Sequence, residues 1–124
     1  MVKPLALVLF EKLIPGSQLV NRLQDLGYRV TTISDPAALA DTAAEAKPML
    51  VVADLVSSKS DVRAGVRQLR ANPATSHVPV IAYAKETPAD LQAAARDAGV
   101  TFLVTETAML SHLAQFLEQA LLVE

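Results

Sequence analysis

The chain has 124 residues, of which 52% are hydrophobic and 4% aromatic, and its formal net charge is −2 at pH 7. We therefore expect a single domain over residues 1–124 with an aliphatic core, and no strong field that would draw the protein to nucleic acid or to an anionic membrane. The absence of cysteine excludes disulfides, thiol catalysis and thiolate metal sites, and it is consistent with a cytoplasmic location.

The first quarter of the chain predicts a buried strand, a helix and an edge strand. Leu5–Phe10 is uniformly apolar, and it meets a charge at Glu11 too early to form a signal peptide or a membrane span. Ser17 is a candidate N-cap for a helix with apolar residues at helical spacing, and Gly27 suits the position after its end. Tyr28–Ile33 is rich in β-branched residues, as an edge strand would be.

The second quarter predicts two further helices with a strand between them. Asp35-Pro36 is a cap followed by proline at the first helical position, and it opens an Ala-rich helix. Met49–Ala53 is an apolar run that predicts another buried strand. Ser60 or Asp61 opens the next helix, and Asn72-Pro73 ends it.

The second half continues the alternation. Val78–Ala84 predicts a strand, and Thr87–Asp90 has the pattern of a capping box before a helix that ends at Gly99. Thr101–Val104 predicts a fifth short strand, and the final helix is expected from about Ala108.

Five strands that alternate with five helices predict an α/β fold with helices on both faces of a parallel sheet. For a chain of this size, the flavodoxin-like doubly wound five-stranded sheet with strand order 2-1-3-4-5 is the expected architecture.

Asp54 is the most informative single residue, because it closes the apolar run Met49–Ala53. In open parallel sheets, the carboxyl ends of the strands are where ligands bind and chemistry takes place. Asp54 is therefore a candidate phosphate acceptor.

Several motifs of core and turn residues point to one family. They are Leu26-Gly27-Tyr28, the run from Lys47 to Asp54, the run from Leu69 to Thr75 followed by Val78 to Ile81, and the run from Ala93 to Gly99. With them the chain resembles, over nearly its whole length, the receiver domain of bacterial two-component response regulators. The resemblance implies that Asp54 stands at the position of the phosphoryl-accepting aspartate.

The resemblance also implies helpers for that aspartate, and most of them are replaced here. A Mg²⁺ ion must offset the repulsion between carboxylate and phosphoryl group, and two acidic residues after the first strand usually hold it. Their matches are Phe10 and Glu11. Glu11 and Asp54 remain as a minimal pair of carboxylates for a weak Mg²⁺ site.

Two other helper positions lack the expected chemistry. The family's phosphate-binding hydroxyl after the fourth strand corresponds to Ala84, and its lysine after the fifth strand corresponds to Thr105 or to Glu106, depending on a one-residue deletion. With the deletion, Phe102 matches the switch aromatic. Because charge-assisted contacts contribute about 1.5–3 kcal/mol each, these losses should weaken a phosphorylated state by several kcal/mol. Lys85 is a candidate substitute cation.

Other features allow both a functional and a structural interpretation. Arg63, Arg67 and Arg70 recur at helical spacing, either as a binding stripe for an acidic partner or as a solvated face. His77 and His112 have no evident third ligand for a metal. By the resemblance, a partner or dimer face is expected around the fourth helix, fifth strand and fifth helix, although the same residues could be ordinary core. Its marker residues are Leu91, Phe102, Leu113 and Leu117.

The leading expectation is a degenerate receiver (a pseudo-receiver) that acts by protein–protein interaction, with phosphorylation lost or weak and no enzymatic activity. Its partner would be a sensor kinase, another regulator or a second copy, and not nucleic acid or membrane. The first alternative is a working receiver that accepts phosphate on Asp54 with Mg²⁺. The second is a small-ligand-binding flavodoxin-like domain, which needs an anion site where Gly16 and Ser17 precede a helix.

Overall fold

The computed structural model describes residues 4–11, 13–55 and 61–122. The strands are β1 (Leu5–Leu9), β2 (Arg29–Ile33), β3 (Leu50–Asp54), β4 (Val80–Ala84) and β5 (Phe102–Thr105). The helices are α1 (Leu13–Asp25), a 3-10 turn (Pro36–Ala38) that leads into α2 (Leu39–Ala46), α3 (Val62–Ala71), α4 (Ala89–Ala98) and α5 (Glu106–Leu122).

The five strands form one parallel sheet in the order β2-β1-β3-β4-β5, which confirms the predicted architecture. Every residue of β1, β3 and β4 is buried, whereas β2 and β5 at the edges are only partly covered. This difference explains why the central strands are continuous apolar runs and β2 is not.

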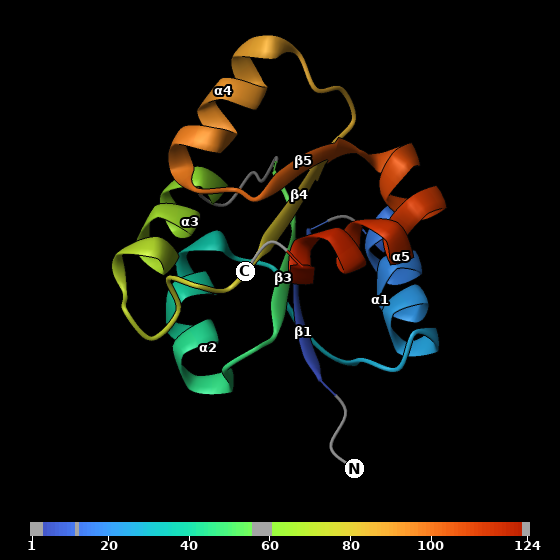
Figure 1. Cartoon of the computed structure of the whole chain (residues 1–124), viewed down its shortest axis with the longest axis horizontal. Helices are drawn as coiled ribbons and strands as arrows, with labels where there is room; N and C mark the ends of the chain where they lie inside the picture. Colours follow the sequence, from blue (N-terminus) through green and yellow to red (C-terminus); the bar gives the residue numbers. More distant parts are fainter. Residues whose placement is uncertain (1–3, 12, 56–60, 123–124) are drawn as a thin grey trace.

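The sheet separates two apolar layers (Figure 1). One side is covered by α2, α3 and α4, and the other by α1 and α5. The first layer is centred on Leu39, Val66, Leu69 and Ala95, and the second on Leu19, Leu23, Met109 and Leu113. None of the described helices is long and apolar enough to cross a membrane.

Most of the helix boundaries follow the predicted signals. The Asp35 side chain accepts a hydrogen bond from the Ala37 amide, and Asp61 accepts one from the Arg63 amide at the start of α3. Gly27 and Gly99 both adopt positive φ after α1 and α4, where a side chain would strain the backbone. Asn72 ends α3 as expected.

One predicted helix start was wrong, one predicted cap does not form, and one start differs by two residues. Helix α1 begins at Leu13 and not after Ser17, because Pro15 lies in its first turn, where a missing amide proton costs nothing. Helix α4 has Pro88 at its cap and no side-chain cap, so the predicted capping box does not form. Helix α5 begins at Glu106, two residues before Ala108.

Candidate functional site

Asp54 ends β3 in the middle of the sheet, and it is 4% exposed. On one side its strand pairs with β1 and on the other with β4, where Tyr83 is its register partner. Strand β1 lies between β2 and β3, so the strand order reverses next to β3. Ligands bind at such a switch point in parallel sheets, and Asp54 lies beside it. The structure therefore places Asp54 where a reactive carboxylate would be useful.

Tyr83 is the residue near Asp54 that sequence reasoning missed. Its side chain is fully buried, and its hydroxyl has no hydrogen-bond partner among the described residues. Burial raises the pKa of the Tyr83 phenol, and the negative charges of Asp54 and Glu106 raise it further. The hydroxyl thus stays protonated, close to two carboxylates. The sequence does place a tyrosine near the end of the fourth predicted strand. The family resemblance singles out only its neighbour Ala84 as a functional position.

The positions expected to hold the phosphate-binding hydroxyl and lysine have structural roles instead. Ala84 is buried and lies opposite Thr105 in the β4–β5 register. The Thr105 hydroxyl oxygen accepts a hydrogen bond of 3.1 Å from the Ala108 amide, and so it caps α5. Glu106 is the first residue of that helix, where its negative charge suits the helix dipole.

Phe10 and Glu11 follow β1 beside the end of β3. The Phe10 amide donates to the Ile33 carbonyl at 3.0 Å, and the Phe10 ring packs so tightly on Gly16 that a Cβ there would collide with it. Glu11 is exposed and lines a depression of about 260 Å³ with Phe10, Thr32, Ile33 and Ser34. An aromatic ring thus stands where the resemblance implies an acidic side chain.

The described residues offer a small donor set for a metal. They contain no cluster of three or more His, Asp or Glu side chains that could hold an ion. Mg²⁺ prefers six oxygen ligands and tolerates several waters, so Glu11 and Asp54 would have to act as a pair supplemented by water. His77 and His112 are both exposed on different segments, and within the described part of the chain neither belongs to a metal cluster.

The anion site expected at Gly16 and Ser17 does not form. Both residues lie inside α1, and Gly16 is buried against Phe10 rather than open before a helix N-terminus. The helix starts four residues earlier than Ser17, since proline is tolerated in a first turn. The flavodoxin-like ligand-binding alternative therefore loses the one feature that motivated it.

Lys85 was the predicted substitute cation for the Asp54 site. Lys85 follows β4 and is exposed. Residues 56–60 of the loop after Asp54, which include Lys59, lie outside the described residues, and so does Lys12. The Thr87 carbonyl oxygen accepts a hydrogen bond of 2.6 Å from the side-chain amide of Gln92 on α4.

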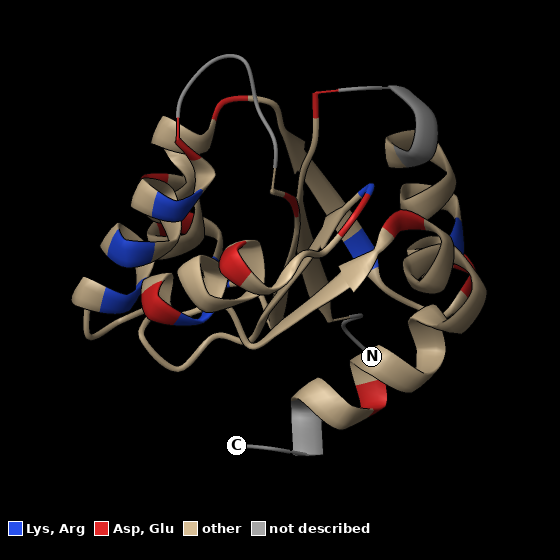
Figure 2. Cartoon of the chain, turned by 90° about the horizontal axis from the view of Figure 1, so that it is seen from above, with Lys and Arg blue, Asp and Glu red and all other residues tan. Residues whose placement is uncertain are grey.

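The stripe of arginines on α3 divides into exposed and structural members. Figure 2 shows the basic positions along this helix, which follows the undescribed segment 56–60. Arg67 is exposed, and Arg63 pairs with Asp61 across the surface. Arg70 instead turns inward and donates to the carbonyl oxygens of Gly99, Ser76 and Val78 at 2.9, 2.8 and 2.6 Å. Arg70 is therefore partly buried, and its guanidinium hydrogen bonds are made within the chain rather than with an acidic partner.

The expected partner face is largely core. Leu113 and Leu117 lie on the inner face of α5 and are 3% and 4% exposed. Leu91 is partly buried against the first apolar layer, and Phe102 is partly buried against the second. Of the large apolar side chains that the structure describes, Leu26 and Met49 are the exposed ones, at 46% and 48%. Exposed apolar surface is thus found at the end of α1, where Leu26 borders α5, and at the start of β3.

Solved structures share this fold. A candidate response regulator from Chloroflexus aurantiacus superposes with a TM-score of 0.88 at 15% identity, with 97% of this chain and 98% of that chain covered. The receiver domain of a sensor histidine kinase from Pseudomonas aeruginosa gives 0.87 at 19% identity, with 97% and 98% covered. The response regulator domain of Thermotoga maritima CheB gives 0.83 at 15% identity, with 99% of each chain covered.

No protein-family model and no curated protein sequence matches the chain. At identities of 15–19% the likeness concerns the path of the backbone, and it carries no residue of those proteins over to this one. The chain has the fold of a receiver domain.

Proposed function

We propose that the chain is a degenerate receiver module of two-component signalling, which acts by binding another protein while phosphorylation of Asp54 is weak or absent. The expected partner is a sensor kinase or another regulator, and the module itself turns over no substrate. The close likeness to receiver domains supports the signalling context. The surroundings of Asp54 support the loss of phosphorylation.

The side chains at the two helper positions at the ends of β4 and β5 carry this proposal. The charges of Asp54 and Glu106 both raise the pKa of the buried Tyr83 phenol, which agrees with a negative rather than a positive environment there. Thr105 uses its hydroxyl oxygen to cap α5, and Ala84 has no polar side-chain atom to offer. A phosphoryl group adds about 1.5–2 negative charges, so Asp54 would need positive partners to hold it.

The test is a reaction of the purified chain with a small phosphodonor and Mg²⁺, followed by intact-mass measurement. We expect no gain of a phosphoryl group that depends on Asp54. Asp54→Ala and Asp97→Ala are the matched variants, because Asp97 is an exposed aspartate on α4 away from the site. A mass gain that Asp54→Ala abolishes and Asp97→Ala retains would overturn the proposal.

A working receiver that uses Asp54 with Mg²⁺ is the second candidate. It is favoured by the position of Glu11 and Asp54 after β1 and at the end of β3, at the sheet's switch point. The similar receiver domain from Pseudomonas aeruginosa coordinates a magnesium ion in its active site cleft. In this case the mass gain would require Mg²⁺ and would be reduced by Glu11→Gln, because the carboxylate would hold the ion.

A further inference from the structure

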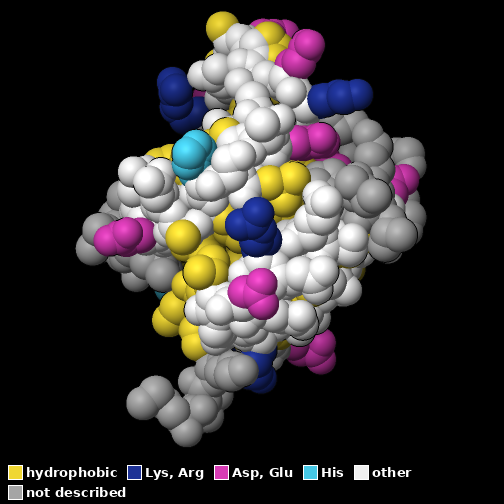
Figure 3. Space-filling model, turned by 90° about the vertical axis from the view of Figure 1, so that its right-hand side faces the viewer, with side chains coloured by type: hydrophobic (Ala, Val, Ile, Leu, Met, Phe, Trp, Pro, Cys, Tyr) yellow, Lys and Arg dark blue, Asp and Glu magenta, His cyan; other side chains and the backbone are white. Residues whose placement is uncertain are grey.

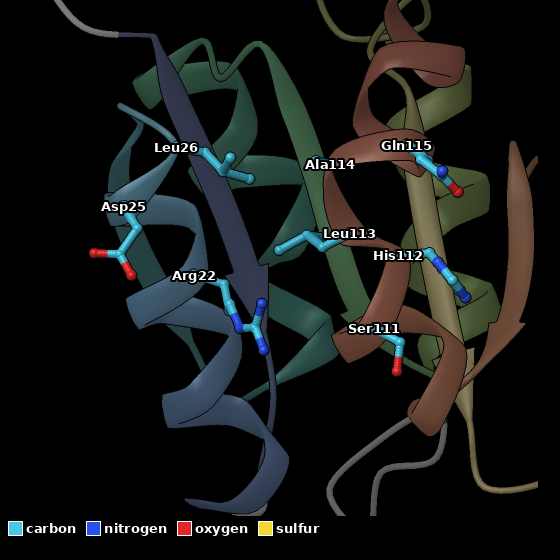
Figure 4. A pocket seen from close by; sticks show the side chains of 8 residues that line it. All are labelled: Arg22, Asp25, Leu26, Ser111, His112, Leu113, Ala114 and Gln115. Carbon is cyan, nitrogen blue, oxygen red and sulfur yellow. The ribbon is translucent and has the colours of Figure 1, made fainter.

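A cavity of about 380 Å³ lies between the C-terminal end of α1 and the middle of α5 (Figure 4). Helix α1 contributes its last turn and the residue after it, and α5 contributes the turns on both sides of His112. The lining residues are Arg22, Asp25, Leu26, Ser111, His112, Leu113, Ala114 and Gln115. Asp54 and the carboxyl ends of the strands contribute nothing to this lining.

A second depression of about 220 Å³ continues the first. It is lined by Leu26, Tyr28, Ala114, Leu117 and Glu118, and it shares Leu26 and Ala114 with the larger cavity. The two form one channel along the surface, which we call the α1–α5 groove. Because both helices run in the same direction, Arg22 lies at one end of this groove and Glu118 at the other.

A kink in α5 explains the hollow shape. His112 has φ −127° and ψ 26°, which departs from helical geometry, so the helix changes direction in the middle of the groove. Leu113 and Leu117 form the floor, and Leu26 stands 46% exposed at the centre. Figure 3 shows hydrophobic side chains gathered on this face, with acidic and basic side chains beside them.

The two ends of the groove carry opposite charges that are not used within the described part of the chain. There, the side chains of Arg22 and Glu118 form no ion pair with another residue. Figure 4 shows Arg22 and Leu26 pointing toward α5, while Asp25 points to the other side of α1. Arg22 therefore faces the groove and can meet a negative charge that another chain supplies.

We propose that the α1–α5 groove is a self-association surface, on which two copies of the chain pack around a two-fold axis. An axis through the centre of the groove places Leu26 of one copy near Leu26 of the other. It also places Arg22 of each copy opposite Glu118 of its partner. The order of charge, apolar centre and opposite charge is self-complementary, as a two-fold interface requires.

We assign a second copy as the occupant because the groove itself carries a positive charge at one end and a negative charge at the other. A foreign acidic segment would suit Arg22 but would meet Glu118 at the far end, and a basic one would meet the reverse problem. This inference rests on the proposed function in that it names one protein partner for the module. It does not depend on whether Asp54 is phosphorylated.

Charge reversal at the two ends provides the test. Sedimentation equilibrium over a concentration series should show a monomer–dimer equilibrium for the natural chain. Arg22→Glu and Glu118→Arg each replace both ion pairs of the dimer by like charges, so each variant alone should raise the dissociation constant by at least about tenfold. Both residues are exposed, and thermal melts should remain those of the natural chain.

Mixing the two variants is the sharper measurement. In a heterodimer of Arg22→Glu with Glu118→Arg, the glutamate introduced at position 22 faces the arginine introduced at position 118. The natural Arg22 and Glu118 that remain form the second pair, so both contacts again join opposite charges. The mixture should therefore form a heterodimer at concentrations where neither variant dimerises alone. Arg67→Glu, on an exposed position of α3, is the matched control and should dimerise like the natural chain.

Three outcomes would overturn the inference. They are a natural chain that stays monomeric at millimolar concentration, single variants that dimerise like the natural chain, and a mixture that stays monomeric. A monomeric result leaves the proposed function standing with a different protein as the partner. A phosphorylated Asp54 in the mass experiment would overturn the proposed function without changing the expectation for the groove.

Discussion

The Tyr83 hydroxyl gives the site a measurable dependence on alkaline pH. Its pKa is raised in the folded protein by burial and by Asp54 and Glu106, so the folded chain keeps this proton above pH 10.0, where an unfolded tyrosine loses it. The unfolded state then binds fewer protons, and the free energy of unfolding falls as pH rises above 10.0. The stabilising effect is complete below that pH.

We predict that Tyr83→Phe removes most of this alkaline loss of stability, because phenylalanine fits the same buried space without an ionisable group. Urea unfolding at neutral pH and above pH 10.0 measures the difference. Tyr28→Phe is the control, since Tyr28 is only partly buried and should leave most of the loss in place. An unchanged alkaline loss in Tyr83→Phe would contradict the assigned environment of the phenol.

At the same scale, the sequence predicted where Asp54 lies but not what surrounds it. A carboxylate after an apolar strand is expected at the carboxyl edge of the sheet, and Asp54 is there. Tyr83 was interpreted only as a strand residue, because its place beside Asp54 depends on which strands become neighbours. The cap made by Thr105 was missed for a similar reason, since it depends on where α5 begins.

Arg70 ties three separate elements together. From α3, its guanidinium donates to the carbonyl of Gly99 after α4 and to those of Ser76 and Val78 before β4. Burial lowers the pKa of Arg70, and the close approach of its side chain to Gly99 leaves no room for a Cβ there. The planar guanidinium holds five donors in a fixed fork that fits these separate carbonyls, whereas a lysine ammonium is a compact point charge with three donors.

We expect Arg70→Ala to lower the free energy of unfolding by about 2–4 kcal/mol, because half-buried carbonyls lose their donors. Arg70→Lys should recover only part of this loss. Arg67→Ala, one turn earlier and exposed, should change stability by less than about 0.5 kcal/mol in the same denaturant titration. Equal effects at the two positions would show that Arg70 is a surface residue in solution.

The helix boundaries also show which structural features can be predicted from the sequence alone. The caps at Asp35 and Asp61 and the glycines at 27 and 99 act locally, and they were predicted correctly. The α1 start was misplaced because proline in a first turn looks the same in sequence as proline before a helix. The stripe on α3 gave no sign that Arg70 turns inward, since its partners come from distant segments.

For the whole molecule, alternating apolar runs and helical patterns were enough to predict the sheet order and the two covered faces. The exposed surface was not predictable in this way. Leu113 and Leu117 have the spacing of an apolar stripe whether the stripe meets the core or a partner, and the structure places them in the core. Leu26 looks like any other helix-end leucine in sequence, yet its side chain is exposed.

The contrast between central and edge strands leads to a prediction for the whole domain. Because β1, β3 and β4 are buried along their full length, their hydrogen-bonded amides should exchange with solvent only through global unfolding. Strands β2 and β5 are partly exposed and have a neighbour on one side only, so they can open locally. We expect their amides to be protected at least about tenfold less in native-state hydrogen exchange followed by NMR. Protection of β5 equal to that of β3 would mean that α5 and β5 open only with the whole sheet, and that the kinked helix is held as firmly as the central strands.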